Sequence, residues 1–149
     1  MVCDADGFAF SVVTGASARP TVAEEETRTV PANLATRGEK LAWLFREAGD
    51  NIERVKPGIL LLVRAGSSPR GGASPERHEV EGLVQLAAHE KRVRSKLLLR
   101  DQVRAIWDVP KAKGAFETIL ERREVAARSN ATKRELYVFA VAALRTNGD

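Results

Sequence analysis

Short apolar runs alternate with polar turns over the first thirty residues, as in strands joined by tight connections. Val2 to Asp4 predicts a very short strand, and Ala5-Asp6-Gly7 predicts a turn because Asp-Gly tolerates positive φ. Phe8 to Thr14 is rich in aromatic and β-branched residues and predicts a second strand. Thr21 to Val30 predicts a third, edge-like strand, with Glu24-Glu25-Glu26 on its solvated face rather than at a metal. These three strands are expected to form an antiparallel meander.

After residue 35, the spacing of apolar residues changes from that of strands to that of helices. Thr36 and Glu39 match the capping-box pattern that starts a helix. The apolar residues that follow recur every three or four positions and share one face: Leu41, Leu44, Phe45, Ala48 and Ile52. Pro57-Gly58 ends this helix, and Ile59 to Val63 is a strand without polar alternation. Such a strand is typical of the centre of a layered α/β fold, where both faces are covered.

The second half of the chain continues this alternation of helices and strands. Ser74-Pro75 predicts a helix start, because Ser caps the backbone and Pro suits the first helical position. Further predictions are a strand at 93–99 and helices at 102–107, 116–127 and 132–144, the last with Thr132 and Glu135 as a capping box. Strands that arrive through helices should pair in parallel. The expected fold is α/β, with a mixed five-stranded sheet flanked by helices in a single domain at 1–149.

Composition limits the classes of protein to which this domain can belong. The 149 residues are 44% hydrophobic, enough for one core, and carry a net charge of +4. The single cysteine, Cys3, excludes an internal disulfide and a cysteine-based zinc site, and its apolar surroundings predict a buried thiol. No apolar run approaches the ~18 residues of a membrane span, and no secretory signal is visible. The expected location is therefore the cytoplasm.

The segment from Arg64 to Gln85 concentrates polar residues between a buried strand and a helix start. Such a junction is a common ligand site in α/β proteins. Arg64 and Arg70, with the Gly71-Gly72 backbone and the helix N-terminus, could cradle a phosphate. A solvated loop explains the same arginines, and Glu76 would compete with an anion there.

A basic run between His89 and Arg104 points to a nucleic-acid partner. Its cations Lys91, Arg92, Arg94 and Lys96 are close in sequence, and Arg64 and Arg70 are further candidate nucleic-acid contacts. On a strand, Arg94 and Lys96 would share one side, from which they could follow phosphates. A solvated edge explains the same run, and few aromatic residues are available to stack on bases.

The order of elements resembles the ribonuclease H-like fold, and within it the RuvC type of Holliday-junction resolvase, over nearly the whole chain. In that family, carboxylates on the first strand, the end of the fourth strand and the last helix hold two divalent metals for phosphodiester hydrolysis. The resemblance implies that Asp4 and Glu135 take the first and last of these places. Arg64 stands where the Glu of the fourth strand is expected, and its permanent charge opposes metal binding. Glu81, on the following helix, is the candidate substitute ligand.

Three functional hypotheses remain open at this point. The first is a catalytically degenerate RuvC-like domain that binds nucleic acid or a protein partner and needs no cofactor. The second is an active nuclease dependent on magnesium or manganese, with Asp4, Glu81 and Glu135 as catalytic metal ligands. The third is a domain that binds a phosphate or small molecule through the Arg64–Gly72 loop. Self-association as a homodimer is also expected, with Trp43 and Trp107 as candidate contacts.

Overall fold

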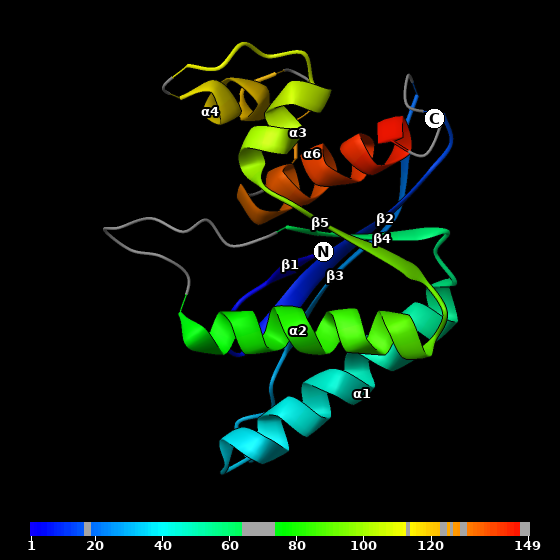
Figure 1. The fold of residues 1–149 in the computed structure, drawn as a ribbon, viewed down its shortest axis with the longest axis vertical. Helices are drawn as coiled ribbons and strands as arrows, with labels where there is room; N and C mark the ends of the chain where they lie inside the picture. The colour runs from blue at the N-terminus through cyan, green and yellow to red at the C-terminus, as the bar shows by residue number, and fades with distance from the viewer. Residues whose placement is uncertain are drawn as a thin grey trace.

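A five-stranded mixed sheet forms the centre of the molecule (Figure 1). The structure, a computed structural model, describes residues 1–16, 19–63, 74–112, 114–122, 125, 127–128 and 131–146, with the backbone alone at 100, 131, 132 and 146. The strand order is β3-β2-β1-β4-β5. The strands are β1 (Val2–Cys3), β2 (Gly7–Thr14), β3 (Thr21–Thr29), β4 (Ile59–Val63) and β5 (Arg94–Leu98).

Pairing within the sheet follows the predicted division. The pairs β1–β2 and β2–β3 are antiparallel, while β1–β4 and β4–β5 are parallel. The early strands are joined by short turns and the later ones by helices, which explains the change of direction. The prediction of an α/β fold with a mixed five-stranded sheet is confirmed.

Helices α1 (Arg37–Val55) and α2 (Pro75–Glu90) lie together on one face of the sheet (Figure 1). The predicted capping box is present, because the Thr36 side chain accepts from the Glu39 N–H while Glu39 accepts from the Thr36 N–H. Ser74 caps α2 as expected. The apolar stripes of both helices meet the inward side chains of the strands in one core cluster. It includes Cys3, Phe8, Phe10, Leu44, Ile52, Leu62, Val80 and Val84.

Helices α3 (Arg100–Ile106), α4 (Ala115–Leu120) and α6 (Ala131–Thr146) lie on the other face. They enclose a second core cluster with Leu61, Val63, Trp107, Ile119, Val138 and Phe139. The helix predicted at 116–127 is shorter than expected, because α4 ends at Leu120. Glu121 and Arg122 follow it outside a helix, and residues 123, 124 and 126 of the predicted helix lie outside the described residues. Within the described residues, no helix combines the length and the apolarity that crossing a membrane requires.

Candidate functional site

A cavity of about 380 Å³ lies at the carboxyl end of β1, between the sheet and the first turns of α2 and α6. Asp4 and Glu25 line it together with the cations Arg77 and Lys133. The remaining lining residues are Val2, Cys3, Ala9, Glu26, Thr27 and Leu136. Opposite charges therefore share this cavity, which is the place where the resemblance predicts a cluster of carboxylates.

Glu25 turns inward from β3 toward α6. It is opposite Ser11 in the β2–β3 register, and its Oε2 lies 3.7 Å from Nζ of Lys133. In the described part of the chain, Glu25 Oε1 and Ser11 Oγ are buried without a hydrogen bond. The expectation that residues 24–26 form one solvated face is wrong for Glu25. Strand alternation sends its side chain beneath α6, while Glu24 on the other face pairs with Arg54 of α1 at 2.8 Å.

Glu81 is buried at 4% exposure, and Arg77 and His78 of its own helix contact it. Its Oε1 lies 3.2 Å from Arg77 Nε, and its Oε2 lies 3.5 Å from His78 Nδ1. Arg77 also donates to the carbonyl of Val63, the last residue of β4, at 3.4 Å. The guanidinium thus lies between Glu81 and the end of β4, and a metal ion at Glu81 would have to compete with it.

Asp4 and Cys3 complete the carboxyl end of β1. Asp4 is exposed, and its Oδ1 accepts from the Asp6 N–H at 3.0 Å, as expected of a turn residue. Cys3 is buried at 1% exposure, which confirms the predicted buried thiol. Burial raises the pKa of this thiol to about 12, while among its charged neighbours the amino terminus and Arg77 lower it and Glu81 and Asp4 raise it. Cys3 therefore stays protonated and is a poor nucleophile at neutral pH.

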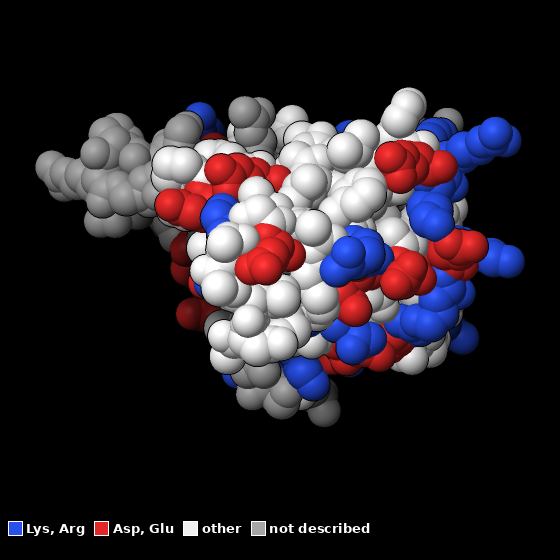
Figure 2. All heavy atoms as spheres, turned by 90° about the horizontal axis from the view of Figure 1, so that it is seen from below, with Lys and Arg blue, Asp and Glu red and all other residues white. Residues whose placement is uncertain are grey.

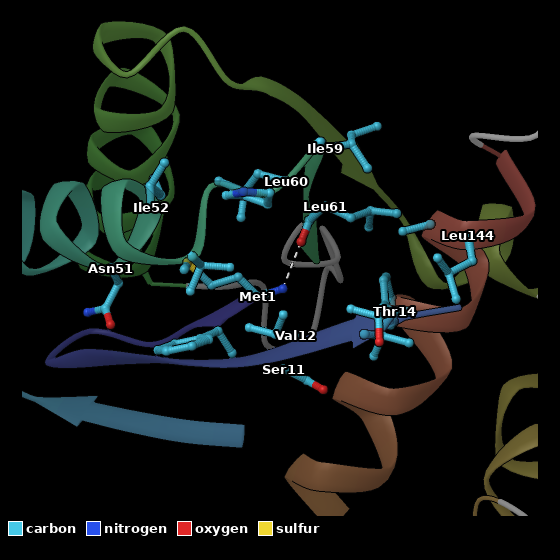
Figure 3. A pocket seen from close by; sticks show the side chains of 18 of the residues that line it. Met1, Ser11, Val12, Thr14, Asn51, Ile52, Ile59, Leu60, Leu61 and Leu144 are labelled. Atoms are coloured by element: carbon cyan, nitrogen blue, oxygen red, sulfur yellow. Dashed lines mark hydrogen bonds between the residues drawn. The ribbon is translucent and has the colours of Figure 1, made fainter. Parts of the chain in front are cut away.

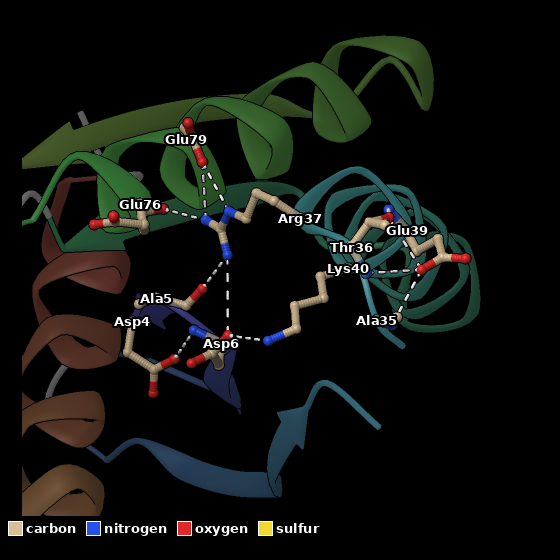
Figure 4. Close-up of polar contacts among 10 residues, drawn as sticks. All are labelled: Asp4, Ala5, Asp6, Ala35, Thr36, Arg37, Glu39, Lys40, Glu76 and Glu79. Atoms are coloured by element: carbon tan, nitrogen blue, oxygen red, sulfur yellow. Dashed lines mark hydrogen bonds and ion pairs between the residues drawn. The ribbon is translucent and has the colours of Figure 1, made fainter. Parts of the chain in front are cut away.

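Arg37 connects the β1–β2 turn with the first turns of α2 (Figure 4). No sequence pattern singled out this residue. Its guanidinium donates to the Ala5 carbonyl at 2.7 Å, to the Glu76 carbonyl at 2.9 Å and to the Glu79 carboxylate at 2.9 Å. Asp6 lies 3.9 Å away as a further acidic neighbour. One side chain from the start of α1 thus positions both the β1–β2 turn and the first turns of α2.

The carboxylates proposed as metal ligands do not form a metal-binding cluster. Across the residues that the structure describes, no three His, Cys, Asp or Glu side chains are grouped so that they could hold a metal ion. Glu81 contacts Arg77, and Glu135 acts electrostatically on the buried Met1 ammonium. The donor set therefore does not fit the two metals that the resemblance implies. Arg64, expected at the place of a further ligand, lies outside the described residues, as does Arg70.

The predicted nucleic-acid residues lie mostly at the other end of the sheet. Lys91 pairs with Glu53 of α1, while Arg92, Arg94 and Lys96 are exposed. Because Arg94 pairs with Ile59, the first residue of β4, the basic part of β5 lies at the amino end of the parallel strands. Acidic and basic side chains are intermixed on the face that Figure 2 shows, rather than separated into a single patch.

The two tryptophans have different environments. Trp107 is 3% exposed, donates from Nε1 to the Val138 carbonyl at 3.0 Å, and has Arg122 and Arg145 over its ring. It is therefore a core residue and not a candidate dimer contact. Trp43 is half-buried against the first core cluster.

Comparisons with known proteins agree on the architecture. No protein-family model matches the chain, and no curated protein matches it in sequence. Among solved structures, RuvC from Thermus thermophilus superposes with a TM-score of 0.75 at 15% identity, over 99% of this chain and 93% of that one. T. thermophilus RuvC in complex with a Holliday junction substrate gives 0.72 at 13% identity, over 99% and 92%. The chain therefore has the ribonuclease H-like fold in the form found in RuvC.

Proposed function

We propose that this chain is a RuvC-like nucleic-acid-binding domain that does not use the two-metal hydrolytic chemistry of the resembled family. Three observations support the proposal: the fold, the Holliday junction bound by a structural neighbour, and exposed cations along an edge strand. The ion pairs at the carboxyl end of β1 are the reason for proposing that the domain does not hydrolyse nucleic acid.

That arrangement replaces a metal cluster with ion pairs. Two divalent ions ~3.5–4 Å apart need several converging carboxylates to balance their charge. Here Arg77 contacts Glu81, and Lys133 contacts Glu25 across the cavity that Asp4 lines. Cations beside each inward carboxylate oppose the entry of divalent metals. The domain is therefore expected to bind nucleic acid without cleaving it.

The edge strand β5 is the proposed contact with phosphates. Val93 and Leu97 pack against the first core cluster, and the alternation of the strand directs Arg94 and Lys96 to the opposite side. Arg92 follows the end of α2 and is also exposed. Such a row suits a sequence-independent contact along a phosphate backbone.

Binding of fluorescent four-way junction and duplex DNA tests the proposal across a salt series, in EDTA and in magnesium. We expect binding in both, with affinity that falls steeply as salt rises. Lys96→Glu should weaken binding several-fold and lower the slope of log K against log salt by about 1 or more. Arg46→Glu, the same charge change on the exposed side of α1, should leave both quantities nearly unchanged.

Two results would contradict this proposal. A lack of salt-sensitive binding to either DNA would remove the binding function. Cleavage dependent on magnesium or manganese, and abolished by Asp4→Asn, would instead establish the active nuclease with Asp4, Glu81 and Glu135. The third hypothesis, a phosphate site in the Arg64–Gly72 loop, rests on residues outside the described part of the chain.

A further inference from the structure

Strand β5 forms one edge of the sheet. It is the last strand in the order β3-β2-β1-β4-β5, so β4 is its only neighbour among the described strands. Its first three residues, Arg94, Ser95 and Lys96, are all exposed. The edge strand at the other end of the sheet, β3, includes half-buried residues along its length. An exposed edge strand is a template on which another chain can add a strand.

The hydrogen bonds of β4 show which of its residues face β5. The Val63 N–H donates to the Met1 carbonyl at 2.9 Å. The Leu61 carbonyl accepts from the Met1 nitrogen at 2.7 Å (Figure 3). Leu61 and Val63 therefore direct their backbone groups toward β1. Because these groups alternate in direction along a strand, Leu60 and Leu62 direct theirs toward β5.

The register of β4 and β5 then determines which backbone groups of β5 are open. Leu60 is opposite Ser95, and Leu62 is opposite Leu97. In a parallel pair, a residue bonds to the two neighbours of the residue opposite it, so the even-numbered residues of β5 bond to β4. Ser95 and Leu97 therefore direct their N–H and C=O groups away from the sheet. Nothing in the described part of the chain bonds to these groups, which we call the open edge.

Two cations flank the open edge. Arg94 and Lys96 extend from one face of β5, while Leu97 packs against the first core cluster on the other face. Neither cation has an ion-pair partner among the described residues, whereas Lys91 pairs with Glu53. The open edge therefore combines backbone donors and acceptors with positive charge that no neighbouring carboxylate balances.

These features favour an acidic polypeptide as the ligand. The carbonyls of the open edge need donors, and a phosphate backbone offers only acceptors. The β5 strand of a second copy would bring like charges together. On β3, the other edge strand, Glu24 pairs with Arg54 of α1, and Glu26 pairs with Arg28. Because these carboxylates are already engaged, a second copy does not supply the acidic strand.

We propose that the open edge of β5 binds an acidic segment of a partner protein as an added antiparallel strand. Residues of the segment opposite Ser95 and Leu97 form the hydrogen-bonded pairs. Residues opposite Arg94 and Lys96 form the other pairs, in which side chains lie closer together, so Glu or Asp suits both positions. The segment thus alternates acidic residues with β-branched ones, and its main chain supplies the hydrogen bonds.

Labelled peptides that contain Val-Glu-Thr-Glu-Val test this proposal by fluorescence anisotropy with the full chain. The peptide should bind, and the same peptide with Lys in place of Glu should not. No binding of the acidic peptide at millimolar protein would overturn the site. Equal binding of the lysine peptide would contradict the role of Arg94 and Lys96.

N-methylation of the peptide separates strand pairing from attraction between charges. A methyl group on the threonine nitrogen removes an N–H that faces the open edge, and affinity should fall by about tenfold or more. The same group on the nitrogen of the first glutamate faces solvent and should change affinity by less than about threefold. Equal affinities of the two methylated peptides would overturn the added strand.

Two variants at one position of the chain locate the binding. Ser95→Pro removes an N–H of the open edge without changing the charge, and its missing N–H is not one that bonds to β4. This variant should bind the acidic peptide about fivefold more weakly or worse. Ser95→Ala keeps the N–H and should bind as the unaltered chain does. Unchanged peptide affinity of Ser95→Pro, in a protein with the circular dichroism of the unaltered chain, would contradict the assignment of the open edge.

DNA binding of the same proteins distinguishes this proposal from the proposed function. Ser95→Pro keeps Arg94 and Lys96, so its DNA affinity should not change. Excess acidic peptide should release DNA, because both would use these two cations, and this expectation alone rests on the proposed function. Peptide binding without DNA binding would contradict the proposed function. DNA binding without peptide binding would contradict the added strand.

Discussion

At the scale of single residues, the site depends on side chains whose partners are distant in sequence. Arg37 contacts Ala5, Glu76 and Glu79, which lie 32 to 42 positions away. Lys133 contacts Glu25, which lies 108 positions away in the sequence (133 − 25). Neither cation has a local sequence signal that distinguishes it from a solvated Arg or Lys. The residues that define the charge of the site were therefore predictable only once the fold was known.

The contacts of Arg37 predict a stabilising role for this side chain. Arg37→Met removes hydrogen bonds to two backbone carbonyls, and the free energy of unfolding should fall by about 1–2 kcal/mol. Arg46→Met, an exposed arginine on the same helix, should change it by less than about 0.5 kcal/mol. Urea denaturation followed by circular dichroism measures both. Equal effects of the two variants would contradict the role given to Arg37.

At the scale of elements, the β2–β3 hairpin depends on a close backbone approach. A Cβ on Gly7 would overlap the carbonyl oxygen of Arg28, its neighbour on β3. Gly7–Thr29 is also the pair of the β2–β3 hairpin that lies nearest to the β1–β2 turn. Gly7 therefore fixes how closely β3 approaches the start of β2, a constraint that the Asp6-Gly7 turn motif did not predict.

Two glycine variants test this constraint. Gly7→Ala should lower the free energy of unfolding by about 2 kcal/mol or more, because the added methyl forces the backbones apart. Gly38→Ala should raise it by up to about 1 kcal/mol, since Gly38 lies in the first turn of α1 and a Cβ there meets no atom within 4 Å. Thermal unfolding of both variants compares the signs. Tolerance of Gly7→Ala would contradict the close approach.

At the scale of the whole molecule, the sheet separates two core clusters. The two tryptophans report on them separately, because Trp43 packs against the cluster under α1 and α2, while Trp107 belongs to the cluster under α6. Hydrogen bonds between strands connect the two clusters through the sheet. The prediction of a single domain at 1–149 therefore implies that both unfold together.

Single-tryptophan proteins measure this cooperativity. In Trp43→Phe only Trp107 fluoresces, and in Trp107→Phe only Trp43 does. In each variant, the denaturant midpoint from fluorescence should coincide with that from circular dichroism, although Trp107→Phe should lower both because it removes the hydrogen bond to Val138. Separate midpoints within one variant would show that the two layers unfold independently.

The sequence by itself determined the elements and their order, because the signals that define them are local. Thr36 and Glu39 cap a helix within one turn, and an apolar run such as Ile59–Val63 indicates a buried strand without knowledge of its neighbours. Strand directions then followed from the length of each connection. The resemblance to the RuvC type rested on this order, and the structural comparison bears out the fold.

Only the tertiary structure decided what each polar side chain faces. The pairing of Glu25 with Lys133 depends on how β3 is registered beneath α6. Such contacts are set by packing between distant segments, which no local pattern encodes. The sequence thus determined the scaffold, while the packing of its elements placed cations beside the carboxylates.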